Sequence, residues 1–313
     1  MTLPGPVIAL VGPTASGKSS LSEAVASSLN GEVVSVDSMQ VYRGMDIGTA
    51  KTPVSERNAP LRMVDICDPC DDFSVQQFQG QCRECIDGLL NSGRPAILCG
   101  GTGLYLDSVI DEMDFPSGKK GDHVRSRYES MLEALGANAL HKLLMDKDPV
   151  SASLIHPNNS RRVIRALEML DEGKSYAEHH EGLLKRAPHY NARIWAITMD
   201  RERLYARIDA RVDEMIAIGL LDEVTHLRAA GLSKERTAGQ AIGYKEILDY
   251  LDGLISMEDA VELIKVRTRR YAKRQLSWLR RDGRAKWLDY DTISEAEALK
   301  LIVDDFYKAK EAR

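Results

Sequence analysis

Short apolar runs alternate with amphipathic stretches over the first hundred residues of the chain. The runs VIALV (7–11), EVVSV (32–36) and PAILC (95–99) have the length and apolar character of buried β-strands. A helical pattern follows the first run, in LSEAVASSL, and another, SVQQFQGQCRECIDGLL (74–90), precedes the third. Because strands that alternate with helices form parallel sheets, the pattern predicts an α/β fold with helices on both faces of the sheet.

The pattern changes near Phe115, where PSGKKGDH breaks it. Residues 122–185 then carry helix-like stretches such as VRSRYESMLEAL and SRRVIRALEML. IWAIT (194–198) resembles a strand that returns to the sheet, and the rest of the chain is again mostly helical. We therefore expect a core, residues 1–115 and 190–313, and a helical insertion, residues 116–189.

A polar stretch follows each of the three early strands. The first strand leads into VGPTASGKSS, the second into DSMQVYRGMDIGTAK (37–51) and the third into GGTGLY (100–105). Ligands of open α/β sheets bind at the carboxyl ends of the strands. We therefore expect these three stretches to meet at one edge of the sheet and to form the functional site.

The first of these stretches is a phosphate-binding loop. Gly12, Gly17, Lys18 and Ser19 complete the pattern G-x-x-x-x-G-K-[ST], and the loop lies between a predicted strand and a predicted helix. Its backbone N–H groups and the helix N-terminus favour an anion. Lys18 would neutralise phosphate charge, and Ser19 would bind a magnesium ion. The fold class is thus P-loop NTPase-like, which also suits a kinase.

Asp37 and Thr102 are the candidate reactive residues at the other two strand ends. Asp37 suits three roles: a magnesium-binding Asp at the end of a strand, a general base, and an ordinary turn residue. The long polar loop after it favours handling of a substrate. Thr102, in Gly-Gly-Thr-Gly, lies either near a ligand or in a tight turn before a helix.

Charge is unevenly distributed along the chain. The net charge is -5, which by itself argues against a nucleic-acid partner. Residues 267–286, however, contain nine Lys or Arg and one acidic residue, with Tyr271 and Trp278 among them. Such a run is either a solvated helix face or a surface for a polyanion. In HPNNSRRVIR (156–165) three arginines crowd a predicted helix start, where the helix dipole disfavours cations.

Composition narrows the class of protein further. Of the 313 residues 43% are hydrophobic, and no apolar run approaches the ~20 residues of a membrane span. The N-terminal stretch lacks a basic signal-peptide region, so we expect a cytoplasmic protein. Two C-x-x-C pairs, at 67–70 and 82–85, are compatible with zinc. Buried thiols on one face of the helix at 74–90 explain the second pair equally well.

Six segments, in this order, resemble the tRNA dimethylallyltransferase family of bacterial type. They are GPTASGKS, DSMQVYRGMDIGTAK, GGTGLY, HPNNSRRVIRALE, GQAIGYKE and YAKRQLSWLR. The resemblance covers about residues 7 to 290. It implies a transferase, also called an isopentenyltransferase, that moves a dimethylallyl group from dimethylallyl diphosphate to N6 of the adenine 3′ to the anticodon. The phosphate loop would then bind a diphosphate with Mg²⁺ and would not hydrolyse ATP. Tyr271 and Trp278 lie in the last segment.

The resemblance also implies a role for individual residues. Asp37 matches the base that takes the proton from the adenine, and Thr102 matches a residue near the reacting centre. The diphosphate contacts would be Gly12, Pro13, Thr14, Ala15, Ser16, Gly17, Lys18, Ser19 and Arg211, with Ser19 also binding the magnesium ion. The tRNA contacts would be Asp37, Ser38, Met39, Gln40, Thr102, Arg125, Arg161, Arg162, Val163, Ile164, Arg165, Gln240, Gly243, Tyr244, Lys245, Lys273, Arg274, Gln275, Trp278 and Arg280.

Two other interpretations of the sequence compete with this one. A small-molecule or nucleotide kinase would use the same phosphate loop, but this interpretation does not explain the basic run at 267–286. A non-catalytic RNA-binding protein does not explain Asp37 and Thr102. We expect a monomer that binds tRNA and dimethylallyl diphosphate and does not bind a membrane.

Overall fold

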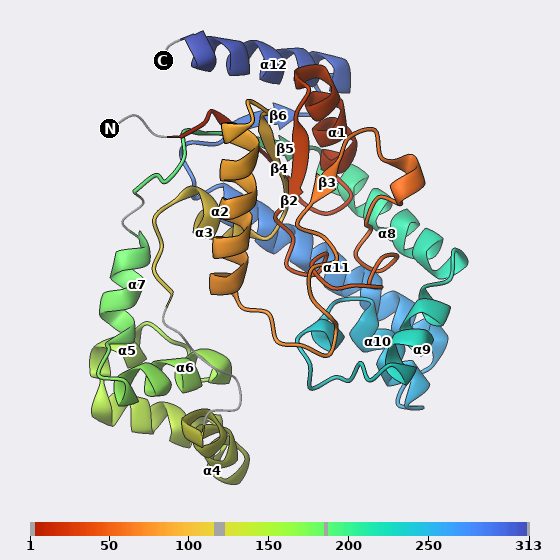
Figure 1. The fold of residues 1–313 in the computed structure, drawn as a ribbon. Helices are drawn as coiled ribbons and strands as arrows, with labels where there is room; N and C mark the ends of the chain where they lie inside the picture. Colours follow the sequence, from red (N-terminus) through yellow and green to blue (C-terminus); the bar gives the residue numbers. More distant parts are fainter. Residues whose placement is uncertain (1–3, 116–122, 185–186, 312–313) are drawn as a thin grey trace. The chain divides into compact units, whose positions relative to one another are not determined.

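The computed structural model describes residues 4–115, 123–184 and 187–311. Its centre is a six-stranded, all-parallel sheet with the strand order β3-β2-β4-β1-β5-β6 (Figure 1). The predicted α/β class and the strands at the four apolar runs are confirmed. The strands are β1 (Val7–Val11), β2 (Glu32–Ser35), β3 (Leu61–Arg62), β4 (Ala96–Gly100), β5 (Ala192–Thr198) and β6 (Lys286–Asp289).

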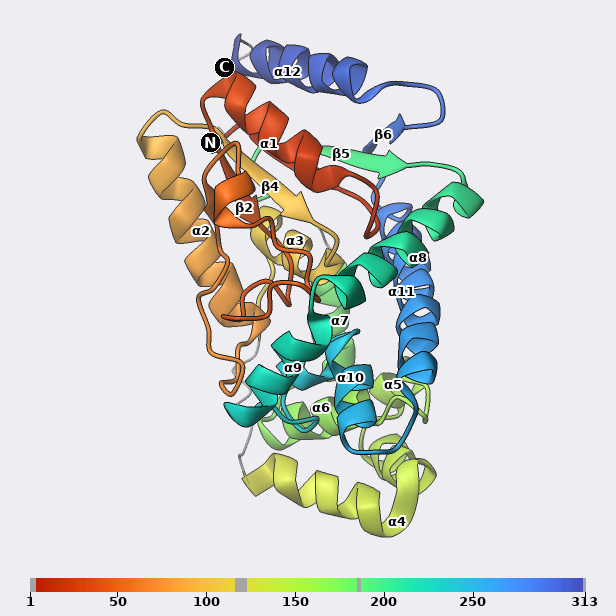
Figure 2. The same cartoon turned by 90° about the vertical axis from the view of Figure 1, so that its right-hand side faces the viewer.

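The two faces of the sheet bury alternate residues of the same strand. In β1, Ile8 and Leu10 pack against helices α1 (Lys18–Leu29) and α12 (Glu295–Glu311). Val7, Ala9 and Val11 point to the other face, where α2 (Val75–Asn91) and α3 (Gly103–Ile110) contribute to the larger core. Figure 2 shows α1 and α12 side by side. The two-residue period of a strand thus explains why every position of β1 is apolar.

Helix α2 begins and packs as its sequence indicates. Ser74 caps the helix, with Gln77 completing a capping box. Phe78, Cys82 and Leu89 are buried on its inner face. Cys82 therefore occupies a core position at which a small apolar side chain is suitable.

The carboxyl edge of the sheet is covered by the C-terminal helices. These are α8 (Arg201–Ala217), α9 (Leu220–Ala229), α10 (Tyr244–Leu251) and α11 (Met257–Leu279). Short 3₁₀ turns lie at Val54–Glu56 and Ala238–Gln240. No helix among the residues that the structure describes is long and apolar enough to cross a membrane.

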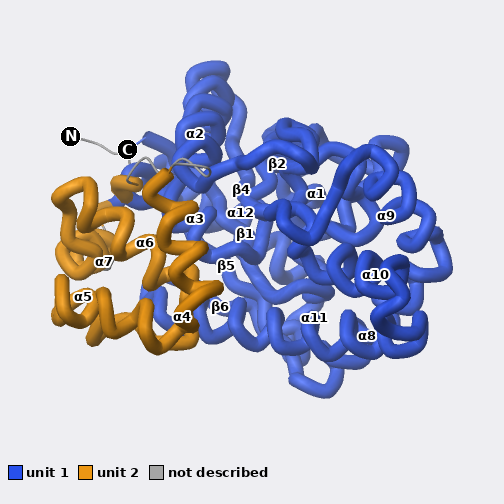
Figure 3. Tube along the Cα trace, turned by 90° about the horizontal axis from the view of Figure 1, so that it is seen from below, with its two compact units in different colours: residues 1–111, 188–313 blue, residues 112–187 orange. Residues whose placement is uncertain are grey.

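The chain divides into two compact units (Figure 3). Residues 1–111 and 188–313 form the unit that contains the sheet, and residues 112–187 form the other. The sequence placed these boundaries at 115/116 and 189/190, a few residues later. Asp111 forms an isolated bridge with Pro188, so the two crossing segments are still paired within the sheet-containing unit at that point. Most of PSGKKGDH, residues 116–122, lies outside the described residues.

The second unit is helical and has its own core. Its helices are α4 (His123–Lys147), α5 (Pro149–Ser153), α6 (Ser160–Asp171) and α7 (Tyr176–Leu184). Tyr128, Leu144 and Leu167 are buried at its centre. Gly136 has φ 81 and interrupts α4, which explains why the predicted helical stretch VRSRYESMLEAL ends one residue earlier.

Candidate active site

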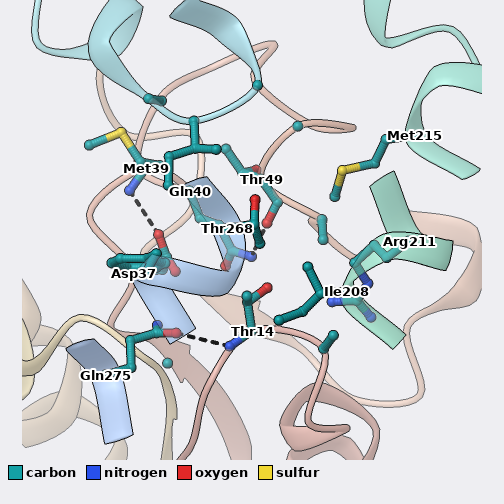
Figure 4. A pocket seen from close by; sticks show the side chains of 18 of the residues that line it. Thr14, Asp37, Met39, Gln40, Thr49, Ile208, Arg211, Met215, Thr268 and Gln275 are labelled. Atoms are coloured by element: carbon teal, nitrogen blue, oxygen red, sulfur yellow. Dashed lines mark hydrogen bonds between the residues drawn. The ribbon is translucent and has the colours of Figure 1, made fainter. Parts of the chain in front are cut away.

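One cavity of about 300 Å³ lies at the carboxyl edge of the sheet (Figure 4). The phosphate loop, the segment after β2 and the end of β4 all contribute to its walls, as do α8 and α11. The prediction that the three strand ends meet in one site is therefore confirmed. The predicted site residues that line it are Thr14, Ala15, Lys18, Ser19, Asp37, Ser38, Met39, Gln40, Arg211, Gln240, Gly243, Arg274 and Gln275.

The conformation of the phosphate loop depends on its own backbone and on a side chain of α11. Gly17 has φ 96, a conformation that a side chain would strain, and it leads directly into α1. The side chain of Gln275 accepts a hydrogen bond from the N–H of Thr14 (3.0 Å) and donates one to the carbonyl of Gly101 (3.0 Å). The hydroxyl of Ser16 is buried and has no hydrogen-bond partner among the described residues. Ser16 does not line the cavity, so its predicted contact with a diphosphate stays a prediction.

The cations at this loop come from two elements. Lys18 lies at the start of α1, and burial lowers its pKa while the nearby Cys99 and Asp37 oppose that effect. Arg211 lines the cavity from α8, and burial followed by the charge of Arg207 lowers its pKa. Arg207 donates from Nε to the carbonyl of Ala15 (2.7 Å). The half-buried charges of Lys18 and Arg211 favour a multiply charged anion in the cavity.

Arg207 was missed by the sequence analysis. Its spacing of four residues from Arg211 would have placed both on one face of a helix. That spacing is the only local signal, because the contact with the phosphate loop joins residues far apart in the sequence.

Of the three roles that the sequence left open for Asp37, the structure shows the turn. Its Oδ1 accepts a hydrogen bond from the N–H of Met39 (2.9 Å), the geometry of an Asx turn. Its Oδ2 forms no hydrogen bond within the described parts of the chain, and the residue lines the cavity (Figure 4). The carboxylate is therefore held by one oxygen, and its action on a ligand through the other stays a prediction.

Thr102 lies next to the cavity and is not among the residues that line it. Its hydroxyl accepts from the N–H of Ser38 (3.3 Å) and lies 3.4 Å from the hydroxyl of Tyr271. Burial raises the pKa of Tyr271 to about 12, so this phenol stays protonated at neutral pH. Thr102 therefore joins the segment after β2 to α11, and its predicted contact with the reacting centre stays a prediction.

Helix α11 presents two different faces. Tyr271 and Gln275 line the cavity. Lys273 lies two residues further on from Tyr271, about 200° around the helix. It lines a second cavity of about 370 Å³ together with Arg280 and Arg201. The predicted tRNA contacts of this segment thus lie on opposite sides of one helix. Trp278 packs against Gly103, whose added Cβ would lie 2.2 Å from the indole ring.

The basic run at 267–286 extends beyond helix α11, which ends at Leu279. Four of its nine cations are already paired, because Arg267, Arg269, Arg284 and Lys286 form salt bridges with Glu246, Asp209, Asp111 and Asp305 respectively. The five cations without a salt bridge to any described residue are Arg270, Lys273, Arg274, Arg280 and Arg281. The three cations of this run that the sequence named as tRNA contacts, Lys273, Arg274 and Arg280, are among the five without a salt bridge.

The predicted contacts around 240–245 lie at the start of α10. Tyr244 is fully buried and donates to Glu223 (2.6 Å), and the Nζ of Lys245 donates to the side chain of Gln240 (3.4 Å). Of the four predicted residues in this group, Gln240 and Gly243 line the cavity. Tyr244 does not line the cavity and therefore contributes to the site only through the residues that it contacts.

The predicted tRNA contacts of the helical unit fall into two groups. Arg161 and Arg162 are exposed at the start of α6, where Asn159 caps the helix. Arg165 pairs with Glu168 (3.2 Å), and Arg125 pairs with Glu129 (3.1 Å) and Glu168 (3.5 Å). Val163 and Ile164 are buried in the core of the unit, so their side chains hold α6 in place.

The five cysteines are free thiols. Within the described residues, no three His, Cys, Asp or Glu side chains are grouped so that they could hold a metal ion. Burial raises the pKa of Cys82, which disfavours the thiolate that zinc requires. We therefore predict that the purified protein contains no zinc, which metal analysis would test.

Comparison with known proteins places the chain in a family. The sequence model of the IPP transferase family matches residues 40–282. A tRNA dimethylallyltransferase of Geobacillus kaustophilus is 47% identical over 285 residues, which are 90% of each chain. The tRNA dimethylallyltransferase of Bacillus subtilis is 46% identical over 94% of each chain.

Solved structures agree with the sequences. The full-length tRNA isopentenylpyrophosphate transferase of Bacillus halodurans has a TM-score of 0.71 and 40% identity, with 98% of this chain and 99% of that chain covered. A eukaryotic dimethylallyltransferase acting on tRNA has a TM-score of 0.77 and 30% identity, with 94% of this chain and 77% of that chain covered. This chain therefore belongs to the IPP transferase family, the family of the tRNA dimethylallyltransferases.

Proposed function

We propose that this chain transfers a dimethylallyl group from dimethylallyl diphosphate to N6 of the adenine 3′ to the anticodon in tRNA, releasing diphosphate. The observation that supports this most strongly is that one cavity is lined by Lys18 and Arg211 on one side and by Asp37 on another. An anion site and a carboxylate thus face the same enclosed space. That is the arrangement needed to ionise an allylic diphosphate beside a weakly nucleophilic amine.

The diphosphate binds at the phosphate loop in this proposal. Backbone N–H groups of the loop, Lys18 and Arg211 stabilise the negative charge that develops as the C–O bond breaks. Their charges are fixed by the fold before the substrate arrives, so little reorganisation is needed.

A magnesium ion suits this site through the hydroxyl of Ser19. Mg²⁺ prefers oxygen ligands, keeps several waters and is often bound by one or two protein groups together with substrate phosphates. Ser19 lines the cavity at the start of α1, and no cluster of acidic side chains is present among the described residues. When bound, the ion would neutralise charge on the departing diphosphate.

The adenine enters from the side of Asp37. The Oδ2 of Asp37 takes the proton from N6 as the new C–N bond forms, while the turn at Met39 fixes the carboxylate. A base in the anticodon loop must leave its stack to reach an enclosed cavity. Correct placement of the two reactants supplies a large part of the rate enhancement.

The tRNA backbone meets cations that form no salt bridge within the described chain. In the sheet-containing unit these include Lys273 and Arg280, and Arg201 lines the same cavity. In the helical unit they include Arg161 and Arg162. Because the acceptor is a tRNA, the cytoplasm is the compartment in which we expect the enzyme to act, as a monomer.

Binding measurements separate this proposal from the kinase alternative, which no observation on the site or its relatives favours. Lys18→Ala should weaken binding of dimethylallyl diphosphate and leave tRNA affinity near normal. Lys273→Ala should do the reverse, because Lys273 lies on the face of α11 away from the phosphate loop. Tight binding of ATP together with undetectable binding of tRNA would contradict the proposal.

A further inference from the structure

The loop after β2 is held by a carboxylate from a distant helix. Glu223, in the first turn of α9, accepts hydrogen bonds from the consecutive N–H groups of Asp46 (3.0 Å), Ile47 (2.8 Å) and Gly48 (3.3 Å). It also accepts one from the hydroxyl of Tyr244 (2.6 Å). Three successive N–H groups that converge on one anion form a backbone nest, and here the anion belongs to the protein.

The segment bound by Glu223 continues into the wall of the active-site cavity. Gly48, Thr49 and Ala50 line the cavity, on the same side as Gln40. Gln40 donates from Nε2 to the carbonyl of Thr49 (3.1 Å). The position of this wall therefore depends on Glu223 at one end and on Gln40 at the other.

The packing behind the wall leaves little room for adjustment. A Cβ added at Gly48 would lie 2.4 Å from the ring of Tyr244. The loop backbone therefore rests directly on the Tyr244 ring, while the Tyr244 hydroxyl holds Glu223. Burial, followed by the charge of Glu223, raises the pKa of Tyr244, so the phenol remains a donor at neutral pH.

The outer part of the same loop has a separate anchor. The Nζ of Lys51 donates to the carbonyl of Tyr42 (2.6 Å) and pairs with Asp46 (2.8 Å) and Asp65 (2.6 Å). The Lys51 side chain is only 3% exposed. Loss of Glu223 would therefore loosen the wall at residues 47–50, while Lys51 would still hold Asp46 and the rest of the loop.

We propose that Glu223 is a positioning residue for the acceptor nucleotide. By holding the nest at 46–48 it fixes the cavity wall at 48–50, against which the adenine is placed relative to Asp37. The phosphate loop, with Lys18 and Arg211, has no part in this nest. This inference rests on the function proposed above. It states that the contact between Glu223 and residues 46–48 affects the placement of the tRNA and not the binding of the diphosphate.

The test compares Glu223→Gln with Asp222→Asn. Both remove one negative charge from the first turn of α9, and the side chain of Asp222 is exposed. In Glu223→Gln the amide nitrogen would face N–H and O–H donors, so the nest should loosen. We expect kcat/KM for an anticodon stem-loop to fall by roughly 10²-fold, the usual cost of a small misplacement. The dissociation constant of dimethylallyl diphosphate should not change, and Asp222→Asn should match the parent protein.

Tyr244→Phe provides a second variant that keeps the ring against Gly48. It removes one of the four donors to Glu223, so a smaller loss in the same direction is expected. Its effect should not add fully to that of Glu223→Gln, because both act on one cluster of hydrogen bonds. If Glu223→Gln does not fold, Tyr244→Phe alone decides the question by the same two readouts.

Two results would overturn the inference. One is an unchanged kcat/KM for RNA in both variants. The other is a parallel loss of diphosphate affinity, which would indicate general loosening of the site. Failure of the parent protein to transfer any label to RNA would instead overturn the proposed function, so the two failures are distinguishable.

Discussion

In the proposed reaction, charged side chains act at two ends of the cavity. Lys18 and Arg211 supply positive charge at the phosphate loop, and Asp37 supplies a carboxylate at the end of β2. Asp37 could be chosen from the sequence because it follows a buried strand. Only the structure shows that its second oxygen has no hydrogen-bond partner within the described residues.

Replacing Asp37 by Asn tests the role of the carboxylate. The amide oxygen of Asn can still accept from Met39, so the turn and the fold should be kept. Loss of a general base typically lowers turnover by about 10²–10⁴-fold. We expect that loss in kcat with unchanged tRNA affinity, measured by steady-state kinetics and direct binding. Unchanged turnover would exclude the base, and a loss confined to magnesium affinity would identify a metal-binding residue.

Affinity for the diphosphate should depend on pH through Lys18. Burial lowers the pKa of Lys18 in the free protein, and a bound anion favours the protonated amine. Below the free-state pKa the affinity should be constant. Above it binding takes up a proton, so affinity should fall by roughly tenfold per pH unit.

Calorimetry in buffers of different ionisation enthalpy measures this proton uptake directly. Lys18→Met should bind weakly and should lose this part of the pH dependence. An uptake that persists in Lys18→Met would assign the titration to another group.

One amide side chain of helix α11 connects the phosphate loop to the segment that follows β4. Gln275 bonds to the phosphate loop at Thr14 and to the strand end at Gly101. Gln275→Leu leaves both backbone groups without a partner, which costs about 1–3 kcal/mol for each buried group. Denaturant unfolding should show this loss, together with a higher KM for dimethylallyl diphosphate.

Ser277→Ala is the matched control on the same helix. Ser277 is exposed and bonds to the carbonyl of Lys273 (2.9 Å), so the free energy of unfolding should change by less than about 0.5 kcal/mol. Equal stability of the two variants would mean that water replaces the amide of Gln275.

The elements that could be predicted were those with a strong local pattern. Strands β1, β2, β4 and β5 are apolar runs, and the cap at Ser74 is marked by the Gln77 that follows it three residues later. Strands β3 and β6 were missed because they are short edge strands of two and four residues, and KWLD at 286–289 carries no alternating pattern. Glu223 was missed because the backbone groups that it holds, at residues 46–48, lie at least 175 residues earlier, and no local pattern in the sequence marks such a contact.

The electrostatics of the molecule as a whole differ from its net charge of -5. Several arginines and lysines form no salt bridge with a described residue in each compact unit, including Arg162 and Lys273. If these residues bind RNA phosphates, each one releases counterions when tRNA binds. We therefore predict a strong dependence of tRNA affinity on salt.

Changing Arg162 and Lys273 to Ala measures that contribution. The slope of log affinity against log salt should fall in magnitude by about 0.7–0.9 for each phosphate that is no longer neutralised. Arg228→Ala serves as the control, because Arg228 already pairs with Asp252 (2.6 Å). A double variant with the slope and affinity of the parent protein would show that both residues are only solvated.

The proposed reaction is tested most simply by a transfer assay with labelled dimethylallyl diphosphate, bulk tRNA and magnesium, run beside an identical assay with labelled ATP. We predict that the dimethylallyl label appears on N6 of the adenine 3′ to the anticodon and that no phosphoryl group is transferred from ATP. A tRNA with guanine at that position should remain unlabelled. Transfer of phosphate from ATP to an acceptor, with no label on any tRNA, would contradict the proposed function.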